Sequence, residues 1–259
     1  MFPYPITIGP LNLNYYGLLV AAGVLAALAL FSLTAPRREM APGLARDFCF
    51  WMVLAGLLGS RFFYVIFHWP EFKDQWWDVF AYWRGGLMFQ GGVVAALLVC
   101  PVFLKYYNLK AWPTADIMAP SLALGQCFGR IGCFSAGCCY GRAANLDHPL
   151  AVVFPYGSLA PAGIHLWPTQ LFESLGLLAL TIILVWAIRN NGSAFSRQGR
   201  VGALYLLGTG LLRLGLEMLR GDYRGDSVIF NLPPTTLTAI TTAVAGLILF
   251  IYLKPKTRL

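Results

Sequence analysis

An arginine stands among four glycines and three cysteines in the segment Gly129–Gly141. The planar guanidinium fork of Arg130 matches the geometry of phosphate oxygens, and glycine allows main-chain N–H groups to approach a ligand closely. Because the segment follows a long apolar run, these residues are suited to grip a lipid phosphate. The simpler interpretation is a helix end that carries an interfacial arginine.

Two further arginines, Arg213 and Arg220, belong to another apolar run, with Glu217 between them. The i, i+4, i+7 spacing predicts that the three side chains share one face of a helix. A charge at bilayer depth costs at least ~2.5 kcal/mol, so this row must face a protein interior or a polar cavity. An ion-pair ladder between two helices would be one way to neutralise these charges. Two arginines against one glutamate nevertheless leave positive charge for an anionic ligand.

Polar side chains also interrupt three other apolar runs. Arg61 is followed one turn later by Tyr64, and Gln170 is followed by Glu173, which could neutralise one buried arginine. Gln90 lies between two pairs of glycines that permit either close helix packing or a backbone cradle for a ligand. The pattern predicts a polar pocket among several helices, at the depth of phosphate headgroups.

The elements that must position these residues are membrane helices. The chain of 259 residues is 58% hydrophobic and 12% charged, with a mean hydropathy of +0.64, whereas soluble domains average about 25% charged residues. Its apolar runs have roughly the 20 residues needed to cross ~30 Å of hydrocarbon. We therefore expect an all-α bundle of seven transmembrane helices around a lipid-binding cavity, in one domain over residues 1–259 with a small external segment at about 135–168. The predicted spans are Tyr15–Leu33, Phe48–Phe67, Gly86–Phe103, Asp116–Phe134, Gln170–Ile188, Val201–Leu219 and Leu237–Leu253.

The distribution of basic residues predicts the orientation of the chain. Alternate connecting segments hold most of the lysines and arginines, and cytoplasmic loops carry this excess in membrane proteins. We therefore expect a cytoplasmic C-terminus and an external N-terminus. The net charge of +8 then faces anionic lipid, and no nucleic-acid partner is needed to explain it. The residues concerned are Arg37, Arg38, Arg46, Lys105, Lys110, Arg189, Arg197, Arg200, Lys254, Lys256 and Arg258.

Three of the six cysteines, Cys133, Cys138 and Cys139, lie within seven residues. No histidine follows at zinc-finger spacing and no second cysteine pair is present, so the spacing argues against a metal site. A local disulfide is possible if the segment faces an oxidising compartment. The sequence contains no nucleotide-binding or metal-binding motif, and no cofactor is expected.

Six motifs in this order resemble the prolipoprotein diacylglyceryl transferase family, and the resemblance covers nearly the whole chain. Members of this bacterial family move the diacylglyceryl group of phosphatidylglycerol to the lipobox cysteine of a prolipoprotein. The motifs are Ile8-Gly9-Pro10 with Tyr15-Tyr16-Gly17-Leu18, Gly59-Ser60-Arg61 with Tyr64, Gly85-Gly86-Leu87-Met88-Phe89-Gln90-Gly91-Gly92, Gly129-Arg130-Ile131-Gly132, Pro168-Thr169-Gln170-Leu171-Phe172-Glu173, and Arg213-x-x-x-Glu217-x-x-Arg220.

The resemblance implies a lipid-modifying transferase of the bacterial inner membrane whose active site opens toward the outer leaflet. Its substrates would be phosphatidylglycerol and a prolipoprotein signal peptide with a lipobox cysteine. Arg130 and Arg213 would hold the lipid phosphate, and Tyr16 and Gln90 occupy the other catalytic positions. The residues expected to bind substrate are Arg61, Tyr64, Gly132, Cys133, Gly141, Gln170, Glu173, Glu217 and Arg220.

The chain departs from the family pattern where the acceptor thiol would be activated. Many members have a histidine at the position of Gln90, and an amide cannot act as a general base near neutral pH. Cys133 replaces a common asparagine, and Cys138 replaces an acidic residue. These departures leave open a divergent paralogue with another acceptor or a catalytically silent lipid-binding scaffold. A third alternative is an anion transporter, although an odd number of spans argues against a two-fold inverted repeat.

Overall fold

The computed structural model divides the chain into two compact units, Met1–Arg38 with Ala115–Leu259, and Glu39–Thr114. The single domain expected from the sequence stays a prediction. Several residues of the sequence argument lie outside the described part of the chain, namely Gly9, Pro10, Arg84 and the basic residues after Leu253. The structure describes residues 6–8, 11–73, 75–82, 85–145, 148–190, 195, 197–222 and 232–253.

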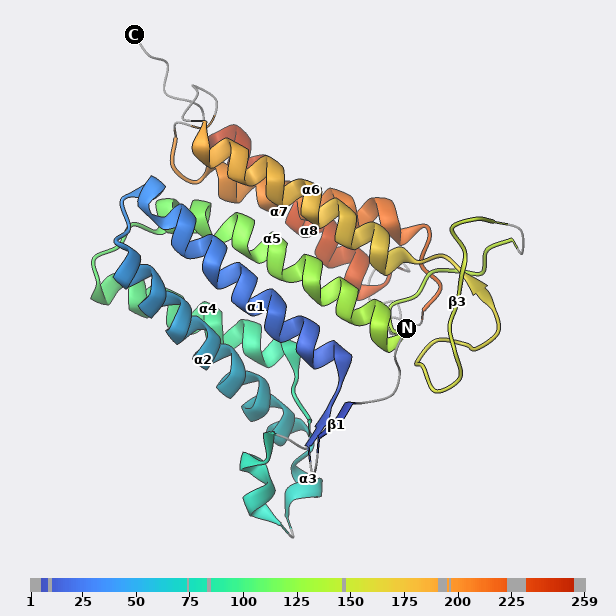
Figure 1. Ribbon diagram of the computed structural model, residues 1–259. Coiled ribbons are helices and arrows are strands. Elements are labelled where there is room, and N and C mark those ends of the chain that lie inside the picture. Colours follow the sequence, from blue (N-terminus) through green and yellow to red (C-terminus); the bar gives the residue numbers. More distant parts are fainter. Residues whose placement is uncertain are drawn as a thin grey trace. The chain divides into compact units, whose positions relative to one another are not determined.

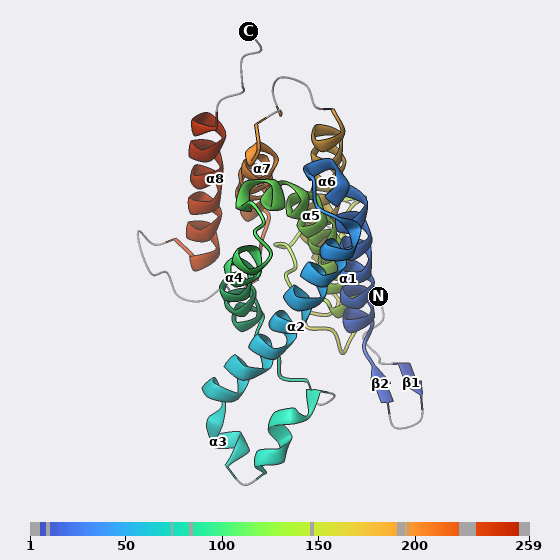
Figure 2. The same ribbon diagram turned by 90° about the vertical axis from the view of Figure 1, so that its left-hand side faces the viewer.

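The first unit is built mainly from long apolar helices (Figures 1 and 2). Helix α7 packs between α6 and α8, and α1 packs closely on α5. A Cβ atom added to Gly23 of α1 would lie 2.6 Å from Cβ of Phe128 and 3.3 Å from the carbonyl oxygen of Gly125, so glycine permits this approach. The elements are α1 (Tyr15–Thr34), η1 (Ala35–Arg38), α5 (Ala111–Ala136, of which the first residues belong to the second unit), α6 (Thr169–Arg189), α7 (Arg200–Glu217) and α8 (Pro234–Tyr252).

The second unit contains α2 (Pro42–Phe67), α3 (Trp69–Phe72), η2 (Trp76–Phe80) and α4 (Phe89–Tyr106). A Cβ atom at Gly59 would lie 2.6 Å from the carbonyl oxygen of Gly91, and one at Gly92 would lie 2.8 Å from that of Gly56. The glycine pair that follows Gln90 therefore serves close packing of α2 and α4. This is the packing role that the sequence left as one of two options.

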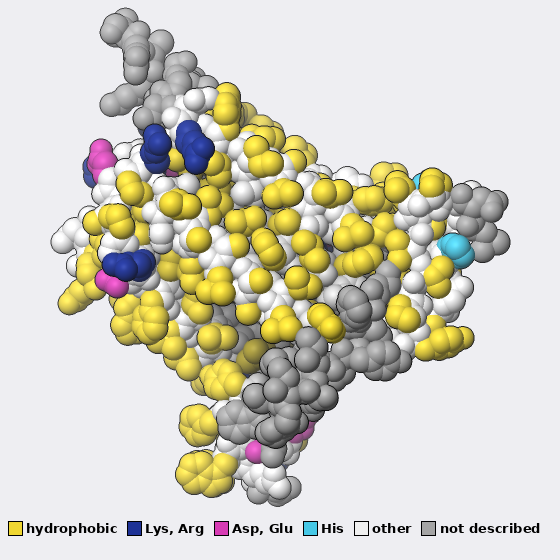
Figure 3. All heavy atoms as spheres, in the orientation of Figure 1, with side chains coloured by type: hydrophobic (Ala, Val, Ile, Leu, Met, Phe, Trp, Pro, Cys, Tyr) yellow, Lys and Arg dark blue, Asp and Glu magenta, His cyan; other side chains and the backbone are white. Residues whose placement is uncertain are grey.

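The seven predicted apolar ranges coincide with α1, α2, α4, α5, α6, α7 and α8. Among the described residues, five helices are long and apolar enough to cross a membrane: α1 with η1, α2, α4, α6 and α8. Helices α5 and α7 carry Asp116, Arg130, Arg213 and Glu217, and these charged residues lower their hydropathy. Hydrophobic side chains predominate on the face of the molecule shown in Figure 3.

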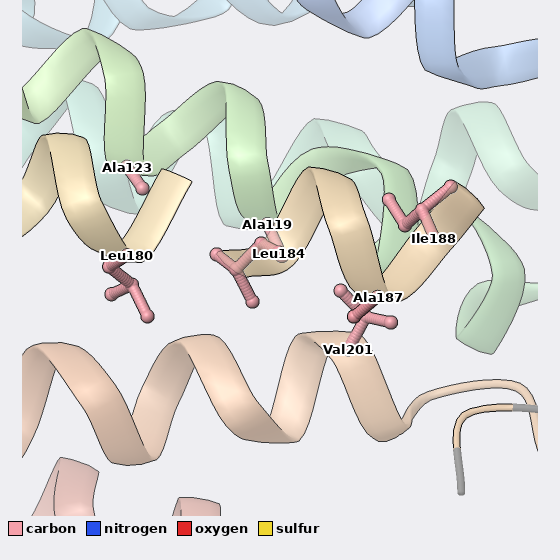
Figure 4. Packing of buried hydrophobic residues seen from close by; sticks show 7 residues of the cluster. All are labelled: Ala119, Ala123, Leu180, Leu184, Ala187, Ile188 and Val201. Atoms are coloured by element: carbon pink, nitrogen blue, oxygen red, sulfur yellow. The ribbon is translucent and has the colours of Figure 1, made fainter. Parts of the chain in front are cut away.

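Small residues on α5 pack against larger side chains of α6 in a buried cluster of the first unit (Figure 4). Leu184 is fully buried against Ala119, and Val201 of α7 completes the cluster. Interlocking of this kind holds α5, α6 and α7 at a fixed separation. The cluster consists of Ala119, Ala123, Leu180, Leu184, Ala187, Ile188 and Val201.

A buried carboxylate fixes the start of α7. Asp116 of α5 accepts hydrogen bonds from the backbone N–H groups of Gly199, Val201 and Gly202 at 2.9, 2.9 and 3.0 Å, and it forms an ion pair with Arg38 at 3.4 Å. A carboxylate at this position satisfies unpaired N–H groups and complements the helix dipole. Asp116 therefore sets the register of α7 against α5.

The segment between α5 and α6 contains little regular structure. Strands β3 (Val152–Val153) and β4 (His165–Leu166) form an antiparallel pair, and Phe154, Ala160 and Leu166 form a small core that also contacts Phe134 and Tyr140. A second hairpin, β1 (Ile6–Ile8) with β2 (Leu11–Leu13), precedes α1. The segment of about 135–168 expected from the sequence thus has its own small core, and its location outside the membrane stays a prediction.

Candidate functional site

One carboxylate joins the two arginines that the sequence singled out. Glu173 on α6 contacts Arg130 on α5 through Oε1 at 3.0 Å and Arg213 on α7 through Oε2 at 3.1 Å. The structure thus brings two arginines from separate helices to one carboxylate, and the polar pocket expected around them stays a prediction. Glu173 was expected to neutralise one arginine, and the structure places it between two.

The arginine pair keeps a surplus of positive charge. One carboxylate cannot balance two guanidinium groups, and contact with Glu173 engages one terminal nitrogen of each. Each guanidinium carries five N–H donors, so most of the fork can receive another acceptor. The side chains of Arg130 and Arg213 are 24% and 17% exposed, partly shielded and still reachable. A phosphodiester would supply the missing negative charge.

Arg220 does not share a helical face with Arg213, and this part of the sequence prediction is wrong. Helix α7 ends at Glu217, and Arg220 lies beyond a turn, in a backbone bridge with Gly141. Its Nε and Nη2 atoms donate to the two carboxylate oxygens of Asp222 at 2.9 and 2.5 Å. Glu217 instead accepts a hydrogen bond from Thr236 of α8 at 2.6 Å.

Close backbone contacts just after Glu217 explain why α7 ends at this residue. Arg142 donates its N–H group to the carbonyl oxygen of Leu219 at 2.8 Å, and Gly141 donates to that of Trp167 at 2.9 Å. A Cβ atom at Gly141 would lie 2.6 Å from the Trp167 oxygen, and one at Gly221 would lie 2.6 Å from Cα of Arg142. Glycine is therefore required where these segments meet. The structure explains Gly141 by this contact, and its contact with substrate stays a prediction.

Gln170 and Thr169 hold the end of the arginine-glycine-cysteine segment in place. The side-chain amide of Gln170 donates to the carbonyl oxygen of Cys138 at 2.8 Å, and the Thr169 hydroxyl donates to that of Cys139 at 3.0 Å. Gln170 is only 1% exposed. Both residues belong to the first turn of α6, so the start of this helix positions the loop. An additional contact between Gln170 and substrate stays a prediction.

The sulfur atoms of Cys133, Cys138 and Cys139 all lie within 4.8 Å of one another. All three are free thiols of intermediate burial, and the side chain of Arg220 contacts Cys139. Hydrogen bonds with Cys133 and Cys138, together with the Arg220 guanidinium, lower the pKa of the Cys139 thiol. The sequence already placed the three cysteines within seven residues, and the structure adds that their sulfur atoms meet in one turn of the chain.

Tyr16 belongs to the same site. It lies in the first turn of α1 and packs over Gly132, where an added Cβ atom would lie 3.2 Å from Cδ2 of the tyrosine ring. Its phenol is close enough to Arg130 and to the cysteine cluster to interact electrostatically with both. The structure thus brings together Tyr16, Gly132 and Cys133 with the arginine pair.

Arg61 lies in the second unit, where it organises the chain between α2 and α4. Its guanidinium donates to the carbonyl oxygens of Asp78, Val79, Gly85 and Gly86 at 2.5–3.0 Å, and the residue is 4% exposed. Gly85 and Gly86 have positive φ angles of 81° and 74°, which glycine adopts without strain. Arg61 therefore positions this segment, and its contact with a lipid stays a prediction.

Tyr64 and Gln90 also belong to the second unit. The ring of Tyr64 stacks on His68 with centroids 4.2 Å apart, and its hydroxyl lies 3.5 Å from a carboxylate oxygen of Glu71. Gln90 is exposed in the first turn of α4. An open, mostly apolar hollow of ≈ 450 Å³ lies between α2, η2 and α4, with Arg61 in its wall. The expected roles of Tyr64 and Gln90 at substrate stay predictions.

Two acidic residues that the sequence did not single out hold parts of the structure in place. Asp222 fixes the guanidinium of Arg220. Asp116, expected as the first residue of a membrane span, is fully buried at the start of α7. The Arg-x-Asp spacing was the available signal for the first. No local signal marked the second, since the N–H groups that it binds at the start of α7 lie more than eighty residues away in the chain.

Comparison with known proteins agrees with the geometry. A family model described as prolipoprotein diacylglyceryl transferase matches residues 3–252. Three relatives are named phosphatidylglycerol–prolipoprotein diacylglyceryl transferase. The one from Synechocystis sp. is 31% identical over 261 residues, covering 98% of this chain and 90% of the relative. That from Gloeobacter violaceus is 34% identical over 252 residues, with coverage of 95% and 91%, and that from Clostridium tetani is 32% identical over 244 residues, with coverage of 93% and 93%. The chain therefore belongs to the prolipoprotein diacylglyceryl transferase family.

Proposed function

We propose that this protein transfers the diacylglyceryl group of phosphatidylglycerol to the lipobox cysteine of a prolipoprotein. Membership of the family supports the reaction, and the names of the relatives specify both substrates. The observation that carries the proposal is the sharing of Glu173 by Arg130 and Arg213. This arrangement holds two guanidinium groups together while leaving charge for one lipid phosphate.

The proposed chemistry is displacement at carbon. The acceptor thiolate attacks the glyceryl carbon that bears the phosphate oxygen, a C–S bond forms as the C–O bond breaks, and the electron pair leaves with glycerol phosphate. Negative charge grows on the phosphate during this step, where fixed guanidinium donors stabilise it most. Glu173 keeps Arg130 and Arg213 oriented before the lipid arrives, so little reorganisation is needed in the transition state.

We further propose that all seven long helices cross the bacterial inner membrane, with the N-terminus outside, the C-terminus in the cytoplasm and the site facing the outer leaflet. The asymmetry of basic residues along the sequence supports this orientation. Helices α5 and α7 are the least apolar of the seven, and their charged residues Asp116, Arg130 and Arg213 are paired with other helices or helix ends. Pairing of this kind makes charges tolerable within a membrane.

The test is a transfer assay in membranes with phosphatidylglycerol and a lipobox peptide. Loss of one fixed donor reduces turnover by about 10²–10³-fold in comparable oxyanion sites, and we expect losses of this order for Arg130→Ala and for Arg213→Ala. Arg189→Ala provides a matched control, because Arg189 is exposed in the last turn of α6. Near-wild-type turnover in either site variant would remove the arginine clamp from the mechanism.

A catalytically silent lipid-binding scaffold is the second candidate, and the glutamine at position 90 favours it. Such a protein would bind phosphatidylglycerol through the same arginines and release no glycerol phosphate. Measuring both quantities on one preparation separates the two: lipid binding together with glycerol phosphate release supports the transferase, whereas binding alone supports the scaffold.

A further inference from the structure

The three thiols at the end of α5 have the geometry of a metal site. Zinc binds thiolate sulfur at about 2.3 Å in a tetrahedral arrangement, which places ligand sulfurs roughly 3.8 Å apart. The sulfur atoms of Cys133, Cys138 and Cys139 already lie within 4.8 Å of one another. Each would have to move by less than about 1 Å to complete the coordination, a shift that side-chain rotation can supply.

The backbone brings these thiols together at a conformational cost. Gly137 and Cys139 have φ angles of 75° and 59°, and a left-handed residue other than glycine is strained. The turn is closed by a hydrogen bond from Cys138 N–H to the Cys133 carbonyl oxygen at 3.1 Å. Gln170 and Thr169 fix the next two carbonyl groups. A rigid turn with a strained cysteine is typical of a preorganised ligand set.

The surroundings suit three thiolates. Arg220 contacts Cys139, and Arg130 interacts electrostatically with Cys133. Positive charge nearby favours thiolate sulfur, the form in which cysteine binds a metal ion. A disulfide would use only two of the three sulfurs, whereas a metal ion accounts for all three.

We propose that Cys133, Cys138 and Cys139 bind one zinc ion and that its fourth position receives the thiol of the acceptor cysteine. Three protein ligands with one open position is the arrangement of catalytic zinc sites, and the cysteines are partly exposed as such a site requires. This inference rests on the proposed function for the identity of the fourth ligand.

The proposal supplies a route to the thiolate that does not depend on a base at position 90. A thiol loses its proton when it coordinates zinc, and that proton passes to solvent. The bound sulfur then attacks the glyceryl carbon, the C–O bond breaks, and the electron pair leaves with glycerol phosphate. Zinc keeps its oxidation state throughout. Arg130 lies beside both the cysteine cluster and Glu173, which brings the phosphate clamp next to the thiol.

Cobalt(II) substitution tests the site on the full-length protein in detergent, without any need for turnover. We expect one cobalt ion per chain with a sulfur-to-cobalt charge-transfer band, and the same stoichiometry for zinc by mass spectrometry. Cys138→Ser and Cys139→Gly should abolish tight binding. Cys139→Gly is the decisive variant, because glycine accepts the positive φ and the loop keeps its conformation. Cys100→Ser is the matched control and should bind cobalt like the wild type.

Failure of the wild type to bind either metal, or unchanged binding in Cys139→Gly, would overturn the proposal. A disulfide between any two of the three cysteines in protein purified without reductant would also overturn it. Addition of a lipobox peptide should raise the charge-transfer intensity by roughly one third, since a fourth thiolate joins three, whereas the Cys→Ser peptide should not. An identical spectrum with both peptides would contradict the open position. Metal and peptide binding without diacylglyceryl transfer would instead refute the proposed function and leave the metal site standing.

Discussion

Removing the charge of Glu173 should destabilise the protein and at the same time make its stability depend more strongly on phospholipid. Two opposite charges about 4 Å apart attract by about 4 kcal/mol at an effective dielectric constant of 20. Glu173 makes two such contacts, at 3.0 and 3.1 Å, with a side chain only 10% exposed. Removing one partner of a buried ion pair typically costs about 3–5 kcal/mol, because the remaining charge stays desolvated.

We therefore expect Glu173→Gln to lower the melting temperature in lipid-free detergent by about 6–12 °C, which corresponds to about 3 kcal/mol for a chain of this size. Phosphatidylglycerol should restore much of the loss, since its phosphate supplies one negative charge between the two guanidinium groups, as the carboxylate of Glu173 did. Diacylglycerol has the same chains without the phosphate and should restore little. Glu71→Gln, at an exposed residue of α3, is the control for loss of a carboxylate.

Thermal unfolding with each lipid is the assay. If phosphatidylglycerol and diacylglycerol stabilised Glu173→Gln equally, the arginines would not be the phosphate site. If Glu173→Gln were as stable as the wild type, the reasoning from the shared carboxylate would itself be refuted.

Four further predictions test other parts of the structure. Gly141→Ala should lower the free energy of unfolding by about 1–3 kcal/mol or more through overpacking. Gly129→Ala is the control and should be neutral or slightly stabilising, because its added Cβ atom meets nothing within 4 Å. Chemical denaturation compares the stability of the two variants. Asp116→Ala should cost about 3 kcal/mol, since it leaves Arg38 and the start of α7 unpaired, and unfolding that proves unaffected would show that α7 is held otherwise. Arg61→Lys should expose residues 73–88 to limited proteolysis, because an ammonium group cannot reach four carbonyls arranged around a planar fork; an unchanged cleavage pattern would contradict the positioning role. Gln90→His should leave turnover within about twofold if zinc deprotonates the acceptor thiol, and a large gain would show that an imidazole base is what the site lacks.

Helix positions could be read from the sequence because membrane crossing demands long apolar runs, and the seven ranges all coincide with helices. The meeting of Arg130 with Arg213 was predictable for a related reason. A charge in an apolar run needs an interior partner, and Glu173 was the acid in the right kind of segment. The sequence could not show that one carboxylate binds two arginines, because the spacing of residues along the chain contains no information on distances between helices.

The error at Arg220 came from a contact between segments distant in the chain. Placing Arg220 on the face of Arg213 assumed that the helix continued, but backbone pairing of Leu219 with Arg142 ends it earlier. The meeting of the three thiols depends on left-handed residues at 137 and 139, which spacing alone does not reveal. Arg61 donates hydrogen bonds to carbonyl groups of its own unit, and its contact with substrate stays a prediction.

Helix α7 is held in place at both ends. Asp116 accepts hydrogen bonds from its first turn, and the backbone of Arg142 pairs with the chain just after its last turn. Asp116 belongs to α5, and Arg142 lies in the segment that follows α5. Arg213 and Arg130 therefore lie on two helices that cannot slide past each other. The distance between the two arginines does not depend on which apolar side chains cover the outer surface of the helices. The outer surface is consequently free to vary with the thickness and acyl composition of the bilayer while the spacing of the two arginines stays the same.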